Sequence, residues 1–159
     1  PYAEFILGSY NQQLCLCDFR YRKMRETVDN RLRRLLSAEF VEQDDEVLVQ
    51  TRKQLEEYFL ATRRAFELPL LTVGTEFQQA VWQALMTVGY GETTSYLKQA
   101  KAIGNEKAVR AVATANGANA LAIIIPCHRV IGSNNELIGY GGGLPLKTKL
   151  LDLESGFQF

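Results

Sequence analysis

The chain has 159 residues, 47% of them hydrophobic, and its 18 basic and 18 acidic side chains give a formal net charge of zero. This composition supports one domain or two small ones, contains no apolar run long enough to cross a membrane, and argues against a protein that binds polyanions over its whole surface. The charge is uneven, because residues 93–149 carry seven basic and two acidic side chains, which indicates a basic face and salt-sensitive binding of nucleic acid.

Two short strands are predicted at the start of the chain. Residues 2–8 and 13–19 have strand-like patterns on either side of a Gly-Ser-Tyr-Asn turn, and the first four residues lack the basic and apolar regions of a signal peptide. Cys15 and Cys17 share one strand face and are too close for an ordinary disulfide. The odd count of three cysteines indicates an intracellular compartment, cytoplasmic and nucleoid-associated if the source is bacterial. We expect no metal, because a structural zinc site needs about four ligands and the chain has one histidine.

Two helices and a connector are predicted to complete the first half. Residues 27–36 form a candidate helix with Val28, Leu32 and Leu35 on its buried face, and its arginines at 31, 33 and 34 are interpreted as a solvated face. Asp44 can cap a second helix that runs to about residue 61. The extended residues 68–71 lead to Gly74, where we place the boundary between an α/β domain (1–73) and a second domain (74–159).

The second half is predicted to be mostly helical. Thr75 opens a capping box for a helix whose buried face runs to position 88, and Thr94 or Ser95 caps a short helix that ends at a glycine turn before the next helix. Helix, short turn and helix is the pattern of a helix-turn-helix, although a small helical hairpin without nucleic acid has the same pattern. Beyond Arg110 the last of these helices has small side chains, so it can approach DNA closely but can read few base edges.

Residues 123–130 are the most informative segment, because three isoleucines run into Pro126, Cys127 and the only histidine, His128. The apolar run predicts a buried strand, which Pro126 would end at the boundary between core and solvent. A cysteine reacts as its thiolate, and a neighbouring base lets it react near neutral pH. A direct Cys127–His128 hydrogen bond needs a turn at Pro126, or else a water bridges them, since strand neighbours point to opposite faces. The alternative is a buried cysteine beside a packed histidine, without chemistry.

The C-terminal segment is predicted to form a hairpin, a loop and a helix. Residues 131 and 137–138 flank a Gly-Ser-Asn-Asn turn, which would be the wing of a winged helix. The glycine-rich loop at 139–143 contains one tyrosine and favours a pocket wall over a plain linker. Pro145 fits the first turn of the last helix and Gly156 its end. Glu154 is either solvated or paired with a group such as His128, because the helix dipole disfavours a carboxylate near a C-terminus.

Together these stretches resemble the O6-alkylguanine-DNA alkyltransferases, also called methylated-DNA–protein-cysteine methyltransferases. The resemblance is carried, in order and spacing, by GETTSY at 91–96, AVRAV at 108–112, NGAN at 116–119, PCHRV at 126–130, GYGGG at 139–143, and Lys147 followed by LLDLE at 150–154. It is close over residues 74–156 and loose over residues 1–73. It implies an α/β N-terminal domain, ribonuclease H-like with a small antiparallel sheet and helices, followed by a mostly α, winged helix-turn-helix-like domain.

The resemblance also implies an activity. Members of the family repair DNA by direct reversal, moving an alkyl group, mainly methyl, irreversibly from O6 of a flipped-out guanine to a protein cysteine, once per molecule. O4 of thymine is a possible second substrate. The implied partner is double-stranded DNA, bound through its minor groove by a monomer, with no cofactor and no membrane.

Roles carry over residue by residue. By resemblance Cys127 is the alkyl acceptor, His128 its base through a water, Glu154 the group that orients His128, and Asn119 the hinge before the predicted strand. The resemblance also implies a set of substrate- and DNA-contacting candidates: Tyr96, Arg110 (which would fill the vacated stack), Tyr140, Gly141 (a serine in some relatives), Arg129, Thr94 and Ser95.

Two other classes of protein remain open from the residues alone. A thiol hydrolase of the Cys-His type would turn over and would need an acyl or ester pocket, but it would leave Arg110 unexplained. A winged-helix regulator or lesion-binding module without chemistry would not need Cys127. Weighing the protein after it has been mixed with DNA that contains methylated guanine would separate all three.

Overall fold

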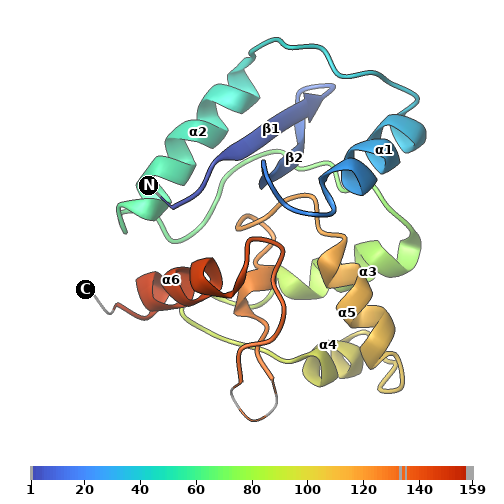
Figure 1. Cartoon of the computed structure of the whole chain (residues 1–159), viewed down its shortest axis with the longest axis vertical. Coiled ribbons are helices and arrows are strands. Elements are labelled where there is room, and N and C mark those ends of the chain that lie inside the picture. Colours follow the sequence, from blue (N-terminus) through green and yellow to red (C-terminus); the bar gives the residue numbers. More distant parts are fainter. Residues whose placement is uncertain (1, 133, 135, 157–159) are drawn as a thin grey trace.

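The computed structural model describes residues 2–132, 134 and 136–156. Its elements, in chain order, are β1 (Phe5–Tyr10), β2 (Gln13–Phe19), α1 (Arg25–Leu36), α2 (Glu46–Phe59), α3 (Glu76–Leu85), α4 (Tyr96–Ala102), α5 (Val109–Gly117), the 3₁₀ turn η1 (Cys127–Arg129) and α6 (Leu144–Ser155). The predicted order of strands and helices in the first half, and the helical second half, are observed. Figure 1 shows α1 and α2 beside the β1–β2 hairpin in one half of the molecule and α3 to α6 in the other. In the described part of the chain, no helix is both long and apolar enough to span a membrane.

The hairpin turns later than the sequence predicted. The antiparallel pairing of β1 with β2 extends to Tyr10↔Gln13, so the turn lies at Asn11 and Gln12 instead of at residues 8–11. Both turn residues have positive φ, 48° and 64°. Two successive residues of this kind are typical of the two-residue turns whose twist matches that of the flanking strands. The tight turn lets β1 continue through residues that the sequence pattern had assigned to the turn.

The two helices of the first half form as predicted, with corrections at their ends and faces. In α1, Val28 and Leu32 are buried, but Leu35 is exposed. The N-cap of α2 is Asp45, whose side chain accepts the N–H of Leu48 at 2.8 Å. The predicted cap Asp44 lies one residue outside the helix, and α2 ends at Phe59.

The caps of α3 and α4 follow the sequence closely, whereas α5 has Ala108 at its N-cap instead of the expected Asn105. Thr75 and Gln78 form the predicted capping box of α3, although this helix ends at Leu85, before the predicted face does. Ser95, rather than Thr94, caps α4 by accepting the N–H three residues later. Helices α3, α4 and α5 pack on one another.

The hydrophobic core is continuous across the two halves. One cluster of buried side chains draws on β2 and α2 from the first half and on α3, α5, α6 and residues 121–125 from the second. Backbone hydrogen bonds also join the halves, because Cys17 donates its N–H to Ala120 O at 2.8 Å and Ala122 donates its N–H to Cys17 O at 2.7 Å. Strand β2 therefore positions the segment that leads into residues 123–130.

The three isoleucines at 123–125 are buried as predicted, but the strand prediction is wrong. Ile123 has a φ of 71°. The N–H of Ile124 donates to Ala122 O, and the N–H of Ile125 donates to Leu121 O, both at 2.8 Å. The chain thus folds back on itself within five residues, and this compact turn satisfies its own buried backbone groups. An apolar run indicates burial, but it does not determine the path of the backbone.

The predicted hairpin at 131–138 is not present as strands among its described residues. Ile131 donates its N–H to Thr94 O at 2.8 Å, so its partner is the start of α4 rather than a following strand. The N–H of Gly132 donates to Glu136 O at 2.7 Å. Two residues of the predicted turn, at 133 and 135, lie outside the described residues.

Candidate active site

Cys127 and His128 lie on the 3₁₀ turn η1, directly after Pro126. Pro126 has a φ of −82° and a ψ of 64°, so the chain bends there, as a close Cys-His arrangement requires. Cys127 is partly exposed, whereas the His128 side chain is fully buried. Among the described residues the two side chains make no direct hydrogen bond, so a proton would pass between them through a bridging group.

Asn119 holds this turn together. Its Oδ1 accepts the N–H of Leu121 at 2.9 Å, and its Nδ2 donates to Ile125 O at 2.9 Å. The same Nδ2 lies 3.3 Å from the Sγ of Cys127, to which it donates. A single buried amide therefore spans the residues 121–125 turn and points a donor at the sulfur. The predicted hinge position is occupied by a side chain that can brace the turn and stabilise a thiolate.

The Glu154 carboxylate contacts His128 and two further side chains. Its Oε2 lies 2.7 Å from Nε2 of His128 and accepts hydrogen bonds from Tyr58 OH at 2.6 Å and from Arg129 Nη2 at 3.0 Å. Its Oε1 accepts from Nε of Arg129 at 2.7 Å. The Glu154 side chain is 1% exposed. A carboxylate this deeply buried is tolerable because charged and polar donors surround it.

The electrostatics of this cluster set the protonation of His128. Burial alone would raise the pKa of Glu154, but the hydrogen bonds from His128, Arg129 and Tyr58 outweigh it and lower the pKa to about 2. Burial lowers the pKa of His128 below its usual value, against the opposing effect of Glu154. His128 is therefore a neutral imidazole at pH 7 that donates Nε2–H to an ionised Glu154. The tautomer leaves a lone pair on Nδ1, which is buried without a hydrogen-bond partner among the described residues and can accept a proton.

The sulfur of Cys127 needs that base. Burial raises the pKa of its thiol above the usual value, although the hydrogen bond from Asn119 and the charges of Arg22 and Lys147 act in the opposite direction. A thiol with a raised pKa is mostly protonated at pH 7, so its reactivity depends on proton removal during the reaction. A thiol, a neutral imidazole and a carboxylate that pairs with the imidazole are the groups that a catalytic triad requires.

A cavity of about 860 Å³ opens over Cys127. Besides Cys127, three of the predicted site residues line it: Tyr96 at the start of α4, and Tyr140 and Gly141 from the glycine-rich loop. The ring of Tyr140 meets that of His128 edge to face, with 6.4 Å between ring centroids, and its hydroxyl is buried without a partner among the described residues. Burial, followed by the nearness of Cys127, raises the pKa of Tyr140 well above its usual value, so its hydroxyl stays a donor. The lining of the cavity thus combines two tyrosines with the Cys127 thiol.

The structure places the other predicted contact residues elsewhere. Arg129 is buried rather than available to DNA, because its guanidinium pairs with Glu154 and donates to Val88 O at 2.6 Å. Thr94 exchanges backbone hydrogen bonds with Arg129 and Ile131, and the Ser95 hydroxyl caps α4. Arg110 is exposed on the first turn of α5 and does not line the cavity. Within the described residues, no group of three or more His, Cys, Asp or Glu side chains could hold a metal ion.

Sequence reasoning missed two side chains from the first half. Tyr58 was assigned only to the apolar face of α2, yet its hydroxyl donates to Glu154. Arg22 was not among the predicted site residues, although it lines the cavity over Cys127. The arginines of α1 were interpreted as solvated, but Arg31 donates to Ala118 O at 2.7 Å and lies over the ring of Trp82. The available signals were a tyrosine on the apolar face of α2 and several arginines after the end of β2. Neither signal identifies a partner far along the chain.

Known proteins are similar to this chain in sequence and in fold. The family model described as "6-O-methylguanine DNA methyltransferase, DNA binding domain" matches residues 76–156. The methylated-DNA–protein-cysteine methyltransferase of Methanosarcina barkeri is 46% identical over 154 residues, 97% of this chain and 92% of that protein. The enzyme of the same name from Methanosarcina acetivorans is 50% identical over 112 residues, 70% of this chain and 72% of the relative.

Solved structures extend the similarity to the fold of both halves. The crystal structure of Mycobacterium tuberculosis OGT in complex with DNA superimposes with a TM-score of 0.83 at 38% identity, covering 96% of this chain and 87% of that one. The crystal structure of Mycobacterium tuberculosis O6-methylguanine methyltransferase covers 99% of this chain and 90% of its own, with a TM-score of 0.81 at 37% identity.

Proposed function

The chain belongs to the methylated-DNA–protein-cysteine methyltransferase family, and from that premise we propose that it repairs DNA by direct reversal with Cys127 as the alkyl acceptor. The observation that carries this assignment is the position of Cys127. Its sulfur faces a cavity, accepts a hydrogen bond from Asn119, and sits one residue before a neutral imidazole held by Glu154. The substrate is O6-alkylguanine, mainly O6-methylguanine, with O4-alkylthymine as a further candidate.

The chemistry is a displacement at the alkyl carbon. The thiol of Cys127 gives its proton to Nδ1 of His128 through a bridging water, and the thiolate forms a sulfur–carbon bond with the alkyl group. The carbon–O6 bond breaks, its electron pair stays on the purine, and the proton taken from the thiol neutralises the released guanine. The products are an S-alkyl cysteine and an unmodified base. Cys15 and Cys17 are buried along β2, and burial raises the pKa of both thiols, so neither offers a second thiolate to take the alkyl group on and each molecule reacts once.

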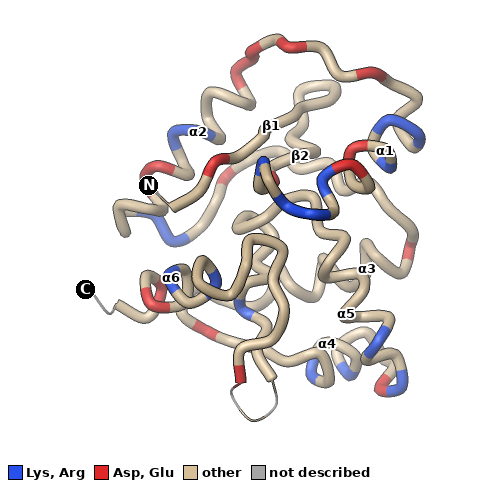
Figure 2. The backbone as a smooth tube through the Cα atoms, viewed as in Figure 1, with Lys and Arg blue, Asp and Glu red and all other residues tan. Residues whose placement is uncertain are grey.

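The DNA-binding face of this proposal is the α4–α5 pair. Four exposed cations lie on α4, on the turn that follows it and at the start of α5: Lys98, Lys101, Lys107 and Arg110. Figure 2 shows that the positions of basic residues recur along these elements at one end of the molecule. The turn between the helices contains Gly104 with a φ of 78°. We assign the pair as a helix-turn-helix whose small-residue helix α5 enters the minor groove, with Arg110 filling the gap left by the flipped base.

The remaining parts of the proposal concern organisation. We divide the chain at residue 74 into an N-terminal domain of the ribonuclease H-like kind and a winged helix-turn-helix-like domain. The small antiparallel sheet with α1 and α2 supports the first description, and the α4–α5 pair supports the second. We propose that the protein acts as a monomer.

Mass spectrometry on single-turnover reactions tests the function. A duplex with one O6-methylguanine should add the mass of one CH₂ group to the protein, mapped to the peptide that contains Cys127. Cys127→Ser should abolish transfer but keep lesion binding, and Cys15→Ala should leave the mass gain in place. His128→Ala should slow transfer by roughly 100-fold, the lower range for a positioned general base.

Three outcomes would count against the proposal. Repeated turnover with an unmodified Cys127 would favour the thiol hydrolase. Lesion binding without any mass gain in the wild-type protein would favour a binding module. An unchanged transfer rate in His128→Ala would remove the base from the mechanism.

A further inference from the structure

A group of buried charges lies at the end of β2, next to the cavity. The Asp18 side chain is fully buried, and those of Arg22 and Arg25 are 6% and 13% exposed. Nη1 of Arg22 donates to both carboxylate oxygens of Asp18, at 3.2 and 3.1 Å, and Nη1 of Arg25 lies 2.9 Å from Oδ2. Arg25 also pairs with Asp29, whose Oδ1 lies 3.1 Å from Nε of Arg25, so the group contains two arginines and two carboxylates. The reaction described above does not use it.

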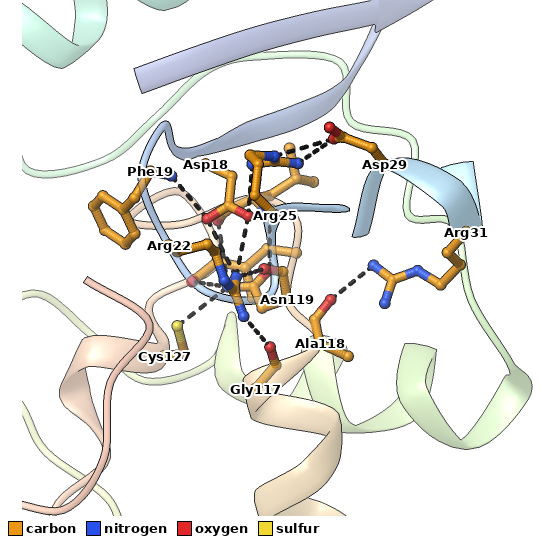
Figure 3. Close-up of polar contacts among 12 residues, drawn as sticks. Asp18, Phe19, Arg22, Arg25, Asp29, Arg31, Gly117, Ala118, Asn119 and Cys127 are labelled. Carbon is orange, nitrogen blue, oxygen red and sulfur yellow. Dashed lines mark hydrogen bonds and ion pairs between the residues drawn. The ribbon is translucent and has the colours of Figure 1, made fainter. Parts of the chain in front are cut away.

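Arg22 extends from this group to the C-terminal end of α5. Its Nη1 donates to Asn119 O at 3.2 Å, and its Nη2 donates to Gly117 O. The last carbonyls of a helix have no partner within the helix and carry the negative end of its dipole, so a guanidinium is a favourable cap. Figure 3 shows the Arg22 guanidinium between Asp18 and Gly117, with Cys127 beside it.

Asn119 links Arg22 to the sulfur of Cys127. Asn119, whose carbonyl Arg22 holds, is the residue whose amide donates to Cys127 Sγ at 3.3 Å. Arg22 also forms part of the cavity wall, where a side chain on Gly141 would meet the guanidinium carbon at 3.2 Å. The guanidinium therefore fills the place of a side chain at position 141, on the same cavity that Tyr96 and Tyr140 line.

We propose that Arg22, an arginine of the first half of the chain, is a positioning residue for Cys127: it fixes the Asn119 hinge through the end of α5, and its charge favours the thiolate. The inference rests on the proposed function and adds a component that lies outside the matched region of residues 76–156. It also gives the N-terminal half a part in the chemistry.

The charges around the sulfur support this role. Arg22 and Lys147 lower the pKa of the Cys127 thiol, whereas Asp18 raises it. The other titratable neighbours are His128 on the same turn, Tyr96 on α4 and Tyr140 on the loop before α6, and their protonation at pH 7 leaves all three neutral. Removing Arg22 would expose the sulfur to a less compensated Asp18, so its pKa would rise further and the reaction would need higher pH.

Two substitutions at Arg22 and one control separate charge from packing. Arg22→Gln removes the charge and most of the hydrogen bonds. Arg22→Lys keeps the charge but cannot donate to Asp18, Gly117 and Asn119 at once. The control, Arg31→Gln, removes an equal charge and a contact to the same helix end, at Ala118, without touching Asn119. Circular dichroism and melting curves establish that each variant is folded.

The first measurement needs no DNA. Iodoacetamide alkylation of the Cys127 peptide is followed by mass spectrometry as a function of pH, which reports on the thiolate directly. The second is the single-turnover transfer rate with methylated duplex. In Arg22→Gln the alkylation profile should move to higher pH, and both rates at pH 7 should fall by roughly threefold or more, whereas Arg31→Gln should keep the wild-type profile.

Arg22→Lys should have the wild-type pH profile but a lower transfer rate at its plateau, because the guanidinium no longer holds the Asn119 carbonyl. This variant carries the test if Arg22→Gln does not fold. A folded Arg22→Gln with the wild-type profile, an equal displacement in Arg31→Gln, or a wild-type plateau in Arg22→Lys would overturn the inference. Absence of transfer in the wild-type protein would instead overturn the proposed function, and the iodoacetamide profiles would still decide the role of Arg22.

Discussion

Replacing Tyr58 by phenylalanine removes one hydroxyl from the cluster around Glu154 and leaves the ring in place. The hydroxyl donates to Glu154 Oε2 at 2.6 Å, and Tyr58 has no exposed surface. Phenylalanine keeps the packing of the ring against Phe59, Phe66 and Tyr90, whose ring centroids lie between 5.3 and 6.2 Å away. The substitution therefore isolates one buried hydrogen bond to an ionised carboxylate.

A hydrogen bond to a charged group contributes about 1.5–3 kcal/mol, so we expect Tyr58→Phe to lower the free energy of unfolding by about 2 kcal/mol at pH 7. For a chain of this length, 1 kcal/mol corresponds to about 2–4 °C in melting temperature, which predicts a decrease of about 4–8 °C. The transfer rate should fall much less than in His128→Ala, because Arg129 still holds Glu154 through Oε1.

Urea denaturation at pH 7 measures the effect, with Tyr90→Phe as the matched control. Tyr90 lies next to Tyr58, but its hydroxyl makes only a 3.4 Å contact to the carbonyl of Leu153, so its removal should change the unfolding free energy by less than about 0.5 kcal/mol. If Tyr58→Phe were as stable as Tyr90→Phe, the view of Glu154 as a carboxylate that depends on all its donors would be refuted.

Two further predictions follow from the site and its DNA face. Because the pKa of Glu154 is lowered from 4.5 to about 2 in the folded protein, its contribution of about 3 kcal/mol is present above pH 4.5 and is lost as the pH falls toward 2. The lowered pKa of His128 acts in the same direction, with its contribution to stability beginning to be lost below about pH 6.5. Urea titrations should show that the free energy of unfolding decreases as the pH falls through this range. Glu154→Gln should flatten the acidic part of this pH dependence. Arg110→Ala should weaken repair of duplex DNA more than reaction with free O6-alkylguanine, because only the duplex requires unstacking, which costs a few kcal/mol; equal losses on both substrates would exclude a role in holding the base gap.

Local patterns predicted those parts of the protein that depend on neighbours in the chain. The capping box of Thr75 and Gln78 was predicted correctly, because a cap is made by side chains a few residues from the backbone groups that they satisfy. The αL end of α6 at Gly156 was predicted for the same reason. The sequence motif also identified Cys127, His128 and Glu154 as a set, although the distance that joins the last two was known only from the fold.

Predictions failed where a residue's partner lies far along the chain. The isoleucines at 123–125 form a turn rather than a strand. Hydrogen bonds to β2 and to the amide of Asn119 satisfy the surrounding backbone groups, so no pairing with a neighbouring strand is needed. Arg129 was expected at the DNA surface, but the buried charge of Glu154 draws its guanidinium inward. An arginine has the same sequence signature in both settings.

Sequence alone identified the candidate thiol, its neighbouring imidazole, the capping box of α3 and the apolar segments, since these follow from residue type and short spacing. Tertiary structure decided the state in which the thiol and imidazole work. Tyr58 donates across 96 residues to Glu154, and Arg22 donates across 97 residues to Asn119. The protonation of His128 depends on burial and on Glu154, and that of Cys127 depends on burial and on charges that include Arg22. This burial and these contacts exist only once the first half of the chain has packed against the second.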